Sequence, residues 1–428
     1  MRVQITPSTL AGQVQAPPSK SYTHRAFLAG GLGNETTIHS PLISADTRAT
    51  LRVIDAFGAA VDHDDNQVHI SGFTGEPQTP NDIIDCANSG TTLRLATATA
   101  GLVDGMTVLT GDDSLRQRPQ GPLLDALTQL GATAKSTRGN GQAPLVISGP
   151  LTGGSVEIPG NISSQFISAL LFAGSQTNEG IGINLTTELK SAPYVDITID
   201  VLSDFGVSAD STTNGFQVAG NQIFAATDDE YSVPADFSSA SYLLAAGAIA
   251  AQDGIRVTGV YPNPQGDTRI VEILRDMGAD ISWNRSAGEI TVQKTPLSGI
   301  TVSVADTPDL LPTIAVLGAV ADGKTRITDC EHVRYKETDR VKVMANCLSE
   351  MGADIQTTQE TFIIDGDRST LTGGEFTDHH DHRIIMALTL AGLVATDPIT
   401  IGDAEHVEVS FPDFFSVLYD LGATIREQ

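Results

Sequence analysis

The spacing of apolar residues predicts two kinds of helix that alternate along the whole chain. The first kind is amphipathic, ends in an apolar residue followed by Gly and then Ala or Val, and precedes an apolar strand. Glycine at such a position takes the left-handed conformation that ends a helix. The glycines recur at intervals of 73, 75, 72, 74 and 70 residues, at Gly58, Gly131, Gly206, Gly278, Gly352 and Gly422.

The second kind of helix is apolar on nearly every side and begins with small polar residues. A helix that is apolar all round is buried. The predicted starts recur at intervals of 70, 74, 74, 72 and 72 residues, near Lys20, Gly90, Ser164, Ser238, Leu310 and His382. Two independent features that share a period of about 72 residues indicate six internal repeats.

The repeat predicts an α/β (α+β) protein with two domains of three units each. Short alternating segments such as 67–70 and 107–109 supply the strands. If the buried helices of a domain run parallel, their N-termini collect at one end, where their partial positive charges attract anions. We therefore expect a cleft lined by helix N-termini. The alternative is a repeat scaffold that carries no chemistry.

The charge balance sharpens this expectation. Among 428 residues, 52 are Asp or Glu and 25 are Lys or Arg, which gives a formal net charge of -27. Such a chain does not bind nucleic acid or an anionic membrane through its general surface. Any anion site must concentrate the few cations. A surface rich in Asp and poor in Lys also favours a salt-adapted cytoplasm.

The cysteines and the apolar runs predict a cytoplasmic location. Cys86, Cys330 and Cys347 are widely spaced and form no CxxC motif, which favours a reducing compartment without disulfides or a zinc site. The first residues lack the apolar core of a signal peptide. The longest apolar runs, near 242–251 and 387–395, are too short to span a bilayer.

The first buried-helix start, Pro17–Arg25, has the residues of a phosphate site. Ser19 is a good N-cap, and Lys20 adds a mobile cation beside the free N–H groups of the first turn. Ser21 and Arg25 are four residues apart and share a helix face, so both can reach one phosphate. Taken alone, the segment could equally be a capped surface helix.

The second and third starts add further candidates. Gly90 lets a ligand approach the backbone closely, and Arg118 lies in the loop before the next outer helix. At the third start, Asn161–Phe166, hydroxyl and amide side chains are suited to a phosphate and to sugar-like hydroxyls. Those side chains are Ser163, Ser164 and Gln165, with Ser191 further on. Each has an ordinary alternative as a cap, a turn or a solvated loop.

The last three starts differ from one another. The one at Asp236 has no cation and predicts a structural cap. Asp309 is either a cap or a catalytic carboxylate, and the dense charge cluster Arg334–Arg340 follows it. In that cluster we expect Lys336 and Arg340, four apart, to share a helix face beside Glu337. The segment Asp378–Arg383 contains three His and two Asp, but their spacing fits no metal site, and Arg383 fits an anion site.

Together these segments resemble the enolpyruvyl transferase family of 5-enolpyruvylshikimate-3-phosphate synthase (3-phosphoshikimate 1-carboxyvinyltransferase). The resemblance runs the length of the chain through Pro18–Ser21 with Arg25, Asn88–Thr91, Arg118–Pro119, Ser163–Gln165, Lys336–Arg340 and Asp381–Arg383. It implies two domains of three βαβαββ units, with helix N-termini facing the cleft between them. The N-terminal-type domain would be 19–229, and the C-terminal-type domain 1–18 plus 230–428, with crossovers near 17–20 and 228–231.

The resemblance implies that the 5-hydroxyl of 3-phosphoshikimate attacks C2 of phosphoenolpyruvate and phosphate leaves, with no cofactor and no metal. Asp309 would accept the hydroxyl proton, and either Glu337 or Lys20 would protonate C3. Residues implied for 3-phosphoshikimate are Lys20, Ser21, Arg25, Ser163, Ser164, Gln165, Ser191, Asp309 and Lys336. Residues implied for phosphoenolpyruvate are Lys20, Gly90, Arg118, Gln165, Arg340 and Arg383. The partners are thus two small molecules, with no nucleic acid or membrane, and we expect a monomer.

Two positions depart from the family pattern, and two other functions stay open. His332 stands where some members have Asn, and Val409 where some have Lys. One alternative is the related enolpyruvyl transferase that acts on UDP-N-acetylglucosamine, but the loop 111–121 lacks the reactive Cys of that family. The other is a non-catalytic phosphometabolite-binding scaffold, which would need neither Asp309 nor Glu337.

Overall fold

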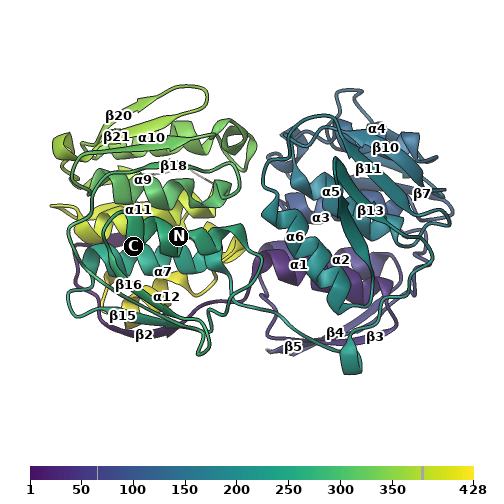
Figure 1. Ribbon diagram of the computed structural model, residues 1–428, viewed down its shortest axis with the longest axis horizontal. Helices are drawn as coiled ribbons and strands as arrows, with labels where there is room; N and C mark the ends of the chain where they lie inside the picture. Colours follow the sequence, from purple (N-terminus) through teal and green to yellow (C-terminus); the bar gives the residue numbers. More distant parts are fainter. Residues whose placement is uncertain (65, 377–379) are drawn as a thin grey trace. The chain divides into compact units, whose positions relative to one another are not determined.

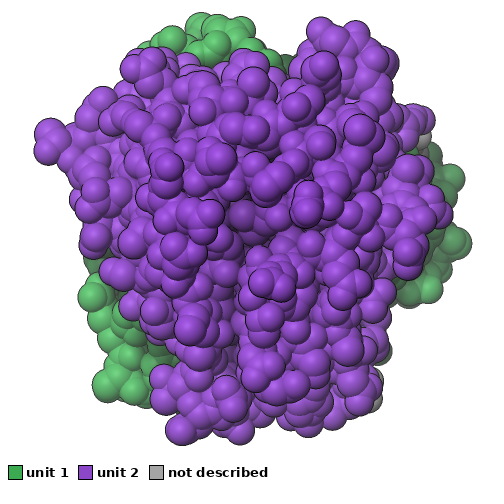
Figure 2. Space-filling model, turned by 90° about the vertical axis from the view of Figure 1, so that its right-hand side faces the viewer, with its two compact units in different colours: residues 1–17, 234–428 green, residues 18–233 purple. Residues whose placement is uncertain are grey.

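A computed structural model describes residues 1–64, 66–376 and 380–428. Contacts within the chain divide it into two compact units, coloured separately in Figure 2. Unit 1 contains residues 1–17 and 234–428, and unit 2 contains residues 18–233. Each unit has its own hydrophobic core. Helices and sheets are mixed in both units (Figure 1), so the α/β class predicted from the sequence is confirmed.

The described part of unit 2 contains three four-stranded sheets. In each, the first strand pairs in parallel with the second, and the other two strands pair antiparallel. The first sheet is β14 (Glu230–Ser232), β3 (Glu35–His39), β5 (Gln67–Ser71) and β4 (Ala60–His63). The second is β6 (Ile84–Asp85), β7 (Met106–Thr110), β9 (Leu145–Ser148) and β8 (Thr133–Ser136). The third is β10 (Gly154–Ile158), β11 (Ile181–Leu185), β13 (Gly215–Val218) and β12 (Ala209–Thr212).

Buried helices pack inside these sheets, as Figure 1 shows for α1, α3 and α5, and amphipathic helices alternate with them along the chain. The buried helices are α1 (Lys20–Leu32), α3 (Gly90–Ala100) and α5 (Ser164–Gly174). The amphipathic helices are α2 (Ala45–Ala56), α4 (Gly121–Gln129) and α6 (Pro193–Asp204), with short 3₁₀ turns η1 (Leu115–Gln117) and η2 (Thr227–Asp229). Eleven of the 13 residues of α1 are buried, as expected for a helix without a continuous polar face.

Unit 1 repeats the same pairing order in its three described four-stranded sheets. Its first sheet is β2 (Gly12–Gln15), β15 (Ile255–Thr258), β17 (Glu289–Gln293) and β16 (Asp280–Asn284). The second is β18 (Thr301–Ser303), β19 (Lys324–Thr328), β21 (Phe362–Asp365) and β20 (Asp354–Thr357). The third is β22 (Gly374–Phe376), β23 (Ile399–Ile401), β1 (Val3–Thr6) and β24 (Thr424–Glu427).

The helices of unit 1 follow the same alternation. The buried ones are α7 (Phe237–Ala250), α9 (Leu311–Ala319) and α11 (His382–Val394). The outer ones are α8 (Ile270–Asp276), α10 (Arg340–Glu350) and α12 (Phe414–Asp420). The 3₁₀ turns are η3 (Gly266–Arg269), η4 (Pro308–Leu310), η5 (Glu331–Tyr335), η6 (Gly366–Arg368) and η7 (Ala404–Val409). No helix in the described ranges combines the length and apolar character needed to cross a bilayer.

The periodic features of the sequence have clear structural counterparts. The six repeating glycines all have positive φ, from 75° to 109°, which confirms that they end helices in the left-handed conformation. The six buried helices begin within one residue of the predicted positions. At one boundary the structure adds a strand: residues 230–232, assigned from the sequence to the C-terminal-type domain, form β14 and pair with β3 of unit 2.

Candidate active site

The start of α1 carries one charged pair near the surface of unit 2. Ser19 caps the helix by accepting a hydrogen bond from the backbone N–H of Tyr22. The Lys20 ammonium lies 3.1 Å from an Asp46 carboxylate oxygen, and the two side chains are only 14% and 11% exposed. Asp46 lies in the first turn of α2, where the helix dipole stabilises a negative charge. The lysine is therefore held in place rather than free in solvent.

The side chain of Arg25 forms hydrogen bonds with three helices near their starts. Its guanidinium donates to Thr198 Oγ1 at 2.8 Å, to Ser168 Oγ at 3.2 Å, and to the backbone carbonyls of Tyr194 at 2.9 Å and Ser21 at 2.8 Å. These partners lie on α1, α5 and α6. Burial lowers the pKa of Arg25 to about 10. At neutral pH the group is still a cation, placed where α5 and α6 begin.

The starts of α3 and α5 are joined by amide and guanidinium contacts. Gln165 donates to Thr91 Oγ1 at 3.0 Å and accepts from Arg94 at 2.5 Å. Arg94 also lies over the ring of Phe166, 5.3 Å from its centroid. Arg94 is not among the site residues expected from the sequence. Its position one turn after Gly90 was the only signal for it.

Gly90 and Arg118 approach each other closely. A Cβ atom on Gly90 would lie 2.9 Å from a terminal nitrogen of Arg118, so a larger residue would displace the arginine. Arg118 is 7% exposed and donates to Asn88 Oδ1 at 3.0 Å. The loop arginine therefore belongs to the start of α3 rather than to solvent.

The predicted serines of unit 2 lie at the starts of α5 and α6. Ser163 caps α5 by accepting from the backbone N–H of Gln165 at 3.3 Å, and Ser164 is buried in the first turn. Ser191 is buried just before α6 and has a φ of 58°, a left-handed conformation that is rare for serine. Strained backbone of this kind is common at binding sites.

In unit 1, Arg340 is the centre of an ionic cluster. It is 1% exposed and donates to Asp309 at 2.7 Å, Glu337 at 2.5 Å and Asp381 at 2.8 Å. Arg383 binds the second oxygen of Asp309 at 2.9 Å. Burial alone would lower the pKa of Arg340, but the surrounding carboxylates raise it well above its usual value. Asp309 is therefore an ion-pair residue and not the N-cap of a helix.

One expectation about this cluster is wrong. Lys336 and Arg340 do not share a helix face, because η5 ends at Tyr335 and α10 begins only at Arg340. Lys336 has extended backbone between the two. Asp339 caps α10 and is bound by two hydrogen bonds from Arg334. These contacts fix the direction in which α10 leaves the loop.

At the start of α7, side chains of the protein already accept hydrogen bonds from the first backbone N–H groups. Asp236 caps the helix, and Gln265 accepts from the backbone N–H of Phe237 at 2.9 Å. Ser238 Oγ donates to Asp267, which is 3% exposed. Burial and the nearby Asp309 charge raise the pKa of Asp267 to about 7. This helix start is thus a structural cap, as the sequence suggested.

The histidine-rich segment lies partly outside the described residues, because Asp378 and His379 fall in the gap. His380 approaches His406 with ring nitrogens 3.4 Å apart. Among the described residues, no three His, Cys, Asp or Glu side chains form a metal-binding group. At the two departures from the family pattern, Val409 is the last residue of η7 and His332 lies within η5.

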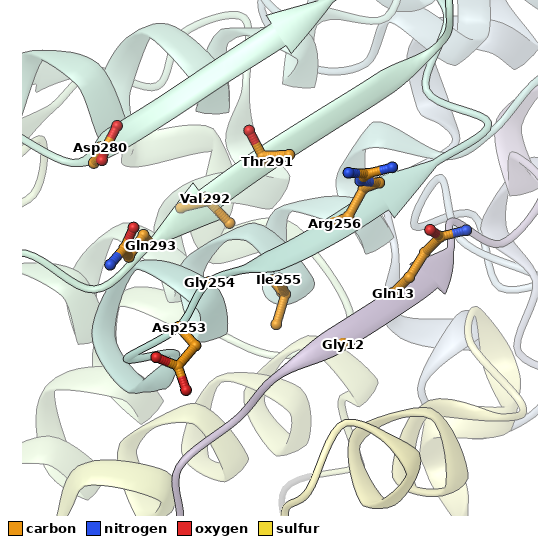
Figure 3. A pocket seen from close by; sticks show the side chains of 10 residues that line it. All are labelled: Gly12, Gln13, Asp253, Gly254, Ile255, Arg256, Asp280, Thr291, Val292 and Gln293. Carbon is orange, nitrogen blue, oxygen red and sulfur yellow. The ribbon is translucent and has the colours of Figure 1, made fainter.

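A hollow of about 490 Å³ lies on unit 1 away from these residues. Figure 3 shows its lining on β2, β15 and β17, with Gln13 and Arg256 on neighbouring strands. Arg256 lies 3.8 Å from Glu289, and the lining also contains Asp253 and Asp280. Carboxylates outnumber cations there, so this hollow is poorly suited to anionic ligands.

Comparisons with known proteins agree on one family. The sequence profile of EPSP synthase (3-phosphoshikimate 1-carboxyvinyltransferase) matches residues 5–418. The 3-phosphoshikimate 1-carboxyvinyltransferase of Halobacterium salinarum is 59% identical over 426 residues, 99% of each chain. That of Natronomonas pharaonis is 58% identical over 437 residues, covering 100% of this chain and 99% of the relative.

Solved structures show the same relationship. EPSP synthase from Acinetobacter baumannii superimposes with a TM-score of 0.84 at 30% identity and covers both chains completely. The enolpyruvyl transferase NikO from Streptomyces tendae superimposes with a TM-score of 0.79 at 19% identity, over 100% of this chain and 98% of NikO. At that identity NikO supports the fold alone.

Proposed function

Because the chain belongs to the EPSP synthase (3-phosphoshikimate 1-carboxyvinyltransferase) family, we propose that residues of both units share the work of its reaction. The enzyme transfers the carboxyvinyl group of phosphoenolpyruvate to the 5-hydroxyl of 3-phosphoshikimate and releases phosphate, a step of the shikimate pathway of aromatic amino-acid biosynthesis. The relatives from Halobacterium salinarum and Natronomonas pharaonis favour this reaction over the UDP-N-acetylglucosamine and scaffold alternatives.

We assign 3-phosphoshikimate to the hydroxyl-rich helix starts of unit 2 with help from unit 1. Arg25 supports this assignment, because its cation is fixed where α5 and α6 begin. Hydroxyl and amide groups there match the hydroxyls and phosphate of the substrate. The residues assigned are Lys20, Ser21, Arg25, Ser163, Ser164, Gln165, Ser191, Asp309 and Lys336.

Phosphoenolpyruvate carries a phosphate and a carboxylate, so its site needs several cations. The site also needs a position where the ligand can lie close to the protein backbone. The contact between Gly90 and Arg118 supplies both features in unit 2. In unit 1, the paired arginines Arg340 and Arg383 supply planar, bidentate donors. The residues assigned are Lys20, Gly90, Arg118, Gln165, Arg340 and Arg383.

Asp309 is the proposed base, and its two arginines explain how it becomes active. Arg340 and Arg383 each bind one oxygen of Asp309. Anionic phosphoenolpyruvate competes for the same guanidinium groups, which leaves Asp309 free to accept a proton. The 5-hydroxyl oxygen then bonds to C2 of phosphoenolpyruvate, its proton goes to Asp309, and C3 takes a proton. Loss of one of the three hydrogens of the new C3 methyl group, as a proton, and loss of phosphate restore the double bond.

Proton delivery to C3 is assigned to Glu337 or Lys20. Glu337 is held by Arg340 at 2.5 Å, and Lys20 by Asp46 at 3.1 Å. Turnover in D₂O distinguishes Glu337 from Lys20 as the acid. In D₂O the acid delivers deuterium to C3, and some of that deuterium remains in the methylene group of the product. Glu337→Gln should abolish this incorporation of deuterium if Glu337 is the acid. Retained incorporation in that variant assigns the step to Lys20.

The observation that carries the proposed roles is the double ion pair of Asp309. The experiment is phosphate release from phosphoenolpyruvate with 3-phosphoshikimate, in the wild type and in Asp309→Ala. We expect the variant to lose about 10²–10⁴-fold in turnover, the range of a lost general base. Wild-type protein that uses UDP-N-acetylglucosamine instead would contradict the assignment. A variant with full turnover would remove Asp309 from the mechanism.

The assembly and setting of the enzyme are also proposals. We infer a monomer in a reducing, salt-rich cytoplasm. Support comes from three free cysteines, all buried, and from the net charge of -27. Light scattering coupled to size exclusion tests the monomer. Activity and thermal stability measured against KCl concentration test the salt adaptation, and no gain at molar KCl would contradict it.

A further inference from the structure

A buried row of polar side chains runs through unit 2 behind the proposed ligand groups. It begins with two contacts between α1 and α2. The Lys20 ammonium binds Asp46 at 3.1 Å, and His24 Nδ1 lies 2.7 Å from Thr50 Oγ1. Within each helix the two contributing residues are four apart, so they lie one turn apart on one face. The outer contact is charged and the inner one is neutral.

The inner contact continues to the start of α3. Thr50 Oγ1 lies 2.7 Å from Thr92 Oγ1, and Thr92 Oγ1 donates to Ser89 Oγ at 2.7 Å. Thr92 Oγ1 also lies 3.4 Å from the backbone carbonyl of Asp46. His24, Thr50, Thr92 and Ser89 are all at most 2% exposed. The row therefore connects three helices inside the core.

The number of hydroxyl protons determines which group donates each hydrogen bond in the row. A threonine hydroxyl has one proton, and Thr92 gives its proton either to Ser89 Oγ or to the Asp46 carbonyl oxygen. The bond between the two threonines must then be donated by Thr50. Since Thr50 has used its proton, the bond to His24 must be donated by Nδ1–H. His24 therefore has a proton on Nδ1, and its buried Nε2 has no hydrogen-bond partner.

The electrostatic surroundings agree with a neutral histidine. Burial lowers the pKa of His24 well below its usual value, and the nearby cations Lys20 and Arg25 lower it further. A protonated ring would place a third positive charge in the core beside those two. The row thus contributes hydrogen bonds without adding charge to the anion site.

We propose that Thr50 and His24 are positioning residues, which hold the Lys20 amine and the first turn of α3 in register for phosphoenolpyruvate. The row reaches both groups: Asp46 binds Lys20, and Ser89 directly precedes Gly90. A chain of buried hydrogen bonds rigidifies the helices that it joins. This inference rests on the proposed roles of Lys20 and Gly90 in phosphoenolpyruvate binding.

Steady-state kinetics of Thr50→Val tests the proposal. Valine keeps the shape of threonine but removes the hydroxyl that both neighbours need. We expect KM for phosphoenolpyruvate to rise about tenfold, the effect of a lost hydrogen bond at a critical position, and KM for 3-phosphoshikimate to change less than twofold. Thr50→Ser keeps the hydroxyl and should restore the wild-type KM.

Thr97→Val is the matched control. Thr97 is buried like Thr50, but it lies in α3. Its hydroxyl donates only to the backbone carbonyl of Leu93, 2.6 Å away in the same helix. This variant removes an equally buried hydroxyl outside the row and should leave both KM values unchanged. Equal effects of the two valine variants, or equal increases in both KM values, would reduce the row to a stabilising feature of the core.

A second measurement does not depend on Thr50→Val. In protein labelled with ¹⁵N at its nine histidines, the His24 resonance should have the chemical shifts of the Nδ1–H tautomer at pH 7. It is assigned by its absence in His24→Gln. An Nε2–H tautomer or a protonated ring would contradict the proton direction and overturn the proposal, even if Thr50→Val does not fold. Wild-type enzyme without phosphate release would instead contradict the proposed function.

Discussion

The two units prepare for anionic substrates in opposite ways. In unit 2 the cations Arg25 and Arg118 bind neutral oxygens, while Lys20 is paired with one carboxylate, that of Asp46. In unit 1 the arginines are bound by carboxylates, three of them on Arg340 alone. Unit 2 thus has cations whose charge is not neutralised by these contacts. Under the proposed assignment, unit 1 exchanges carboxylates for substrate when its arginines bind an anion.

The same contrast predicts that substitutions in the two units change the stability of the fold to different extents. Cations that bind neutral oxygens can be removed without leaving buried negative charge. A buried arginine that neutralises several carboxylates cannot. Substitutions in the two units should therefore have different effects on folding, even where they have similar effects on turnover.

The largest expected effect is that of Lys20→Ala, in unit 2. We expect turnover to fall about 10³-fold or more, because the variant loses a cation assigned to both substrates. The melting temperature should fall by only a few degrees, because Asp46 remains at the favourable N-terminus of α2. Phosphate release and thermal unfolding, measured on one preparation, check both halves. Appreciable turnover would remove Lys20 from the site.

Arg340→Leu is the counterpart in unit 1. Leucine leaves Asp309, Glu337 and Asp381 without the arginine that binds all three. We expect a loss of about 3–5 kcal/mol in the free energy of unfolding, together with loss of activity. Urea unfolding at constant salt measures it. A variant as stable as Lys20→Ala would erase the difference between the units.

Asp267→Asn changes the pH dependence of stability. The pKa of Asp267 is raised from 3.8 to about 7 in the folded protein, so the folded state binds this proton more tightly than the unfolded state. Wild-type stability is therefore lost as pH rises from about 4 to about 7, by roughly 4 kcal/mol at most. Asparagine cannot ionise, so the variant should gain stability relative to wild type over that range. Parallel unfolding curves at pH 5 and pH 8 would contradict this.

Gly90→Ala should have the smallest effect, and only on binding. The added Cβ would lie 2.9 Å from a terminal nitrogen of Arg118, so the arginine must move. We expect KM for phosphoenolpyruvate to rise about tenfold, with stability and KM for 3-phosphoshikimate nearly unchanged. An unchanged KM for phosphoenolpyruvate would separate Gly90 and Arg118 from that substrate.

The sequence predicted what depends on local periodicity. The starts of the buried helices and the left-handed glycines follow from a repeat of about 72 residues. The expected helix face shared by Lys336 and Arg340 was wrong, because the chain is extended at Lys336 and the helix starts only at Arg340. Helical spacing alone does not reveal such a boundary.

Contacts between distant repeats could not be predicted. Asp309 meets Arg340 and Arg383, which are 31 and 74 residues away in the sequence. Nothing in the local pattern near Asp267 distinguishes it from a surface acid, although the fold buries it. Such contacts depend on how whole helices pack, and a single sequence contains no direct record of that packing.

Calorimetric binding of phosphoenolpyruvate to Asp309→Asn tests directly whether carboxylate is exchanged for substrate in unit 1. If substrate must displace Asp309 from Arg340 and Arg383, removing the carboxylate charge should tighten binding, by about tenfold, while turnover is lost. Tighter binding with no turnover is the predicted result. Weaker binding that accompanies the loss of turnover would contradict the exchange of carboxylate for substrate in unit 1.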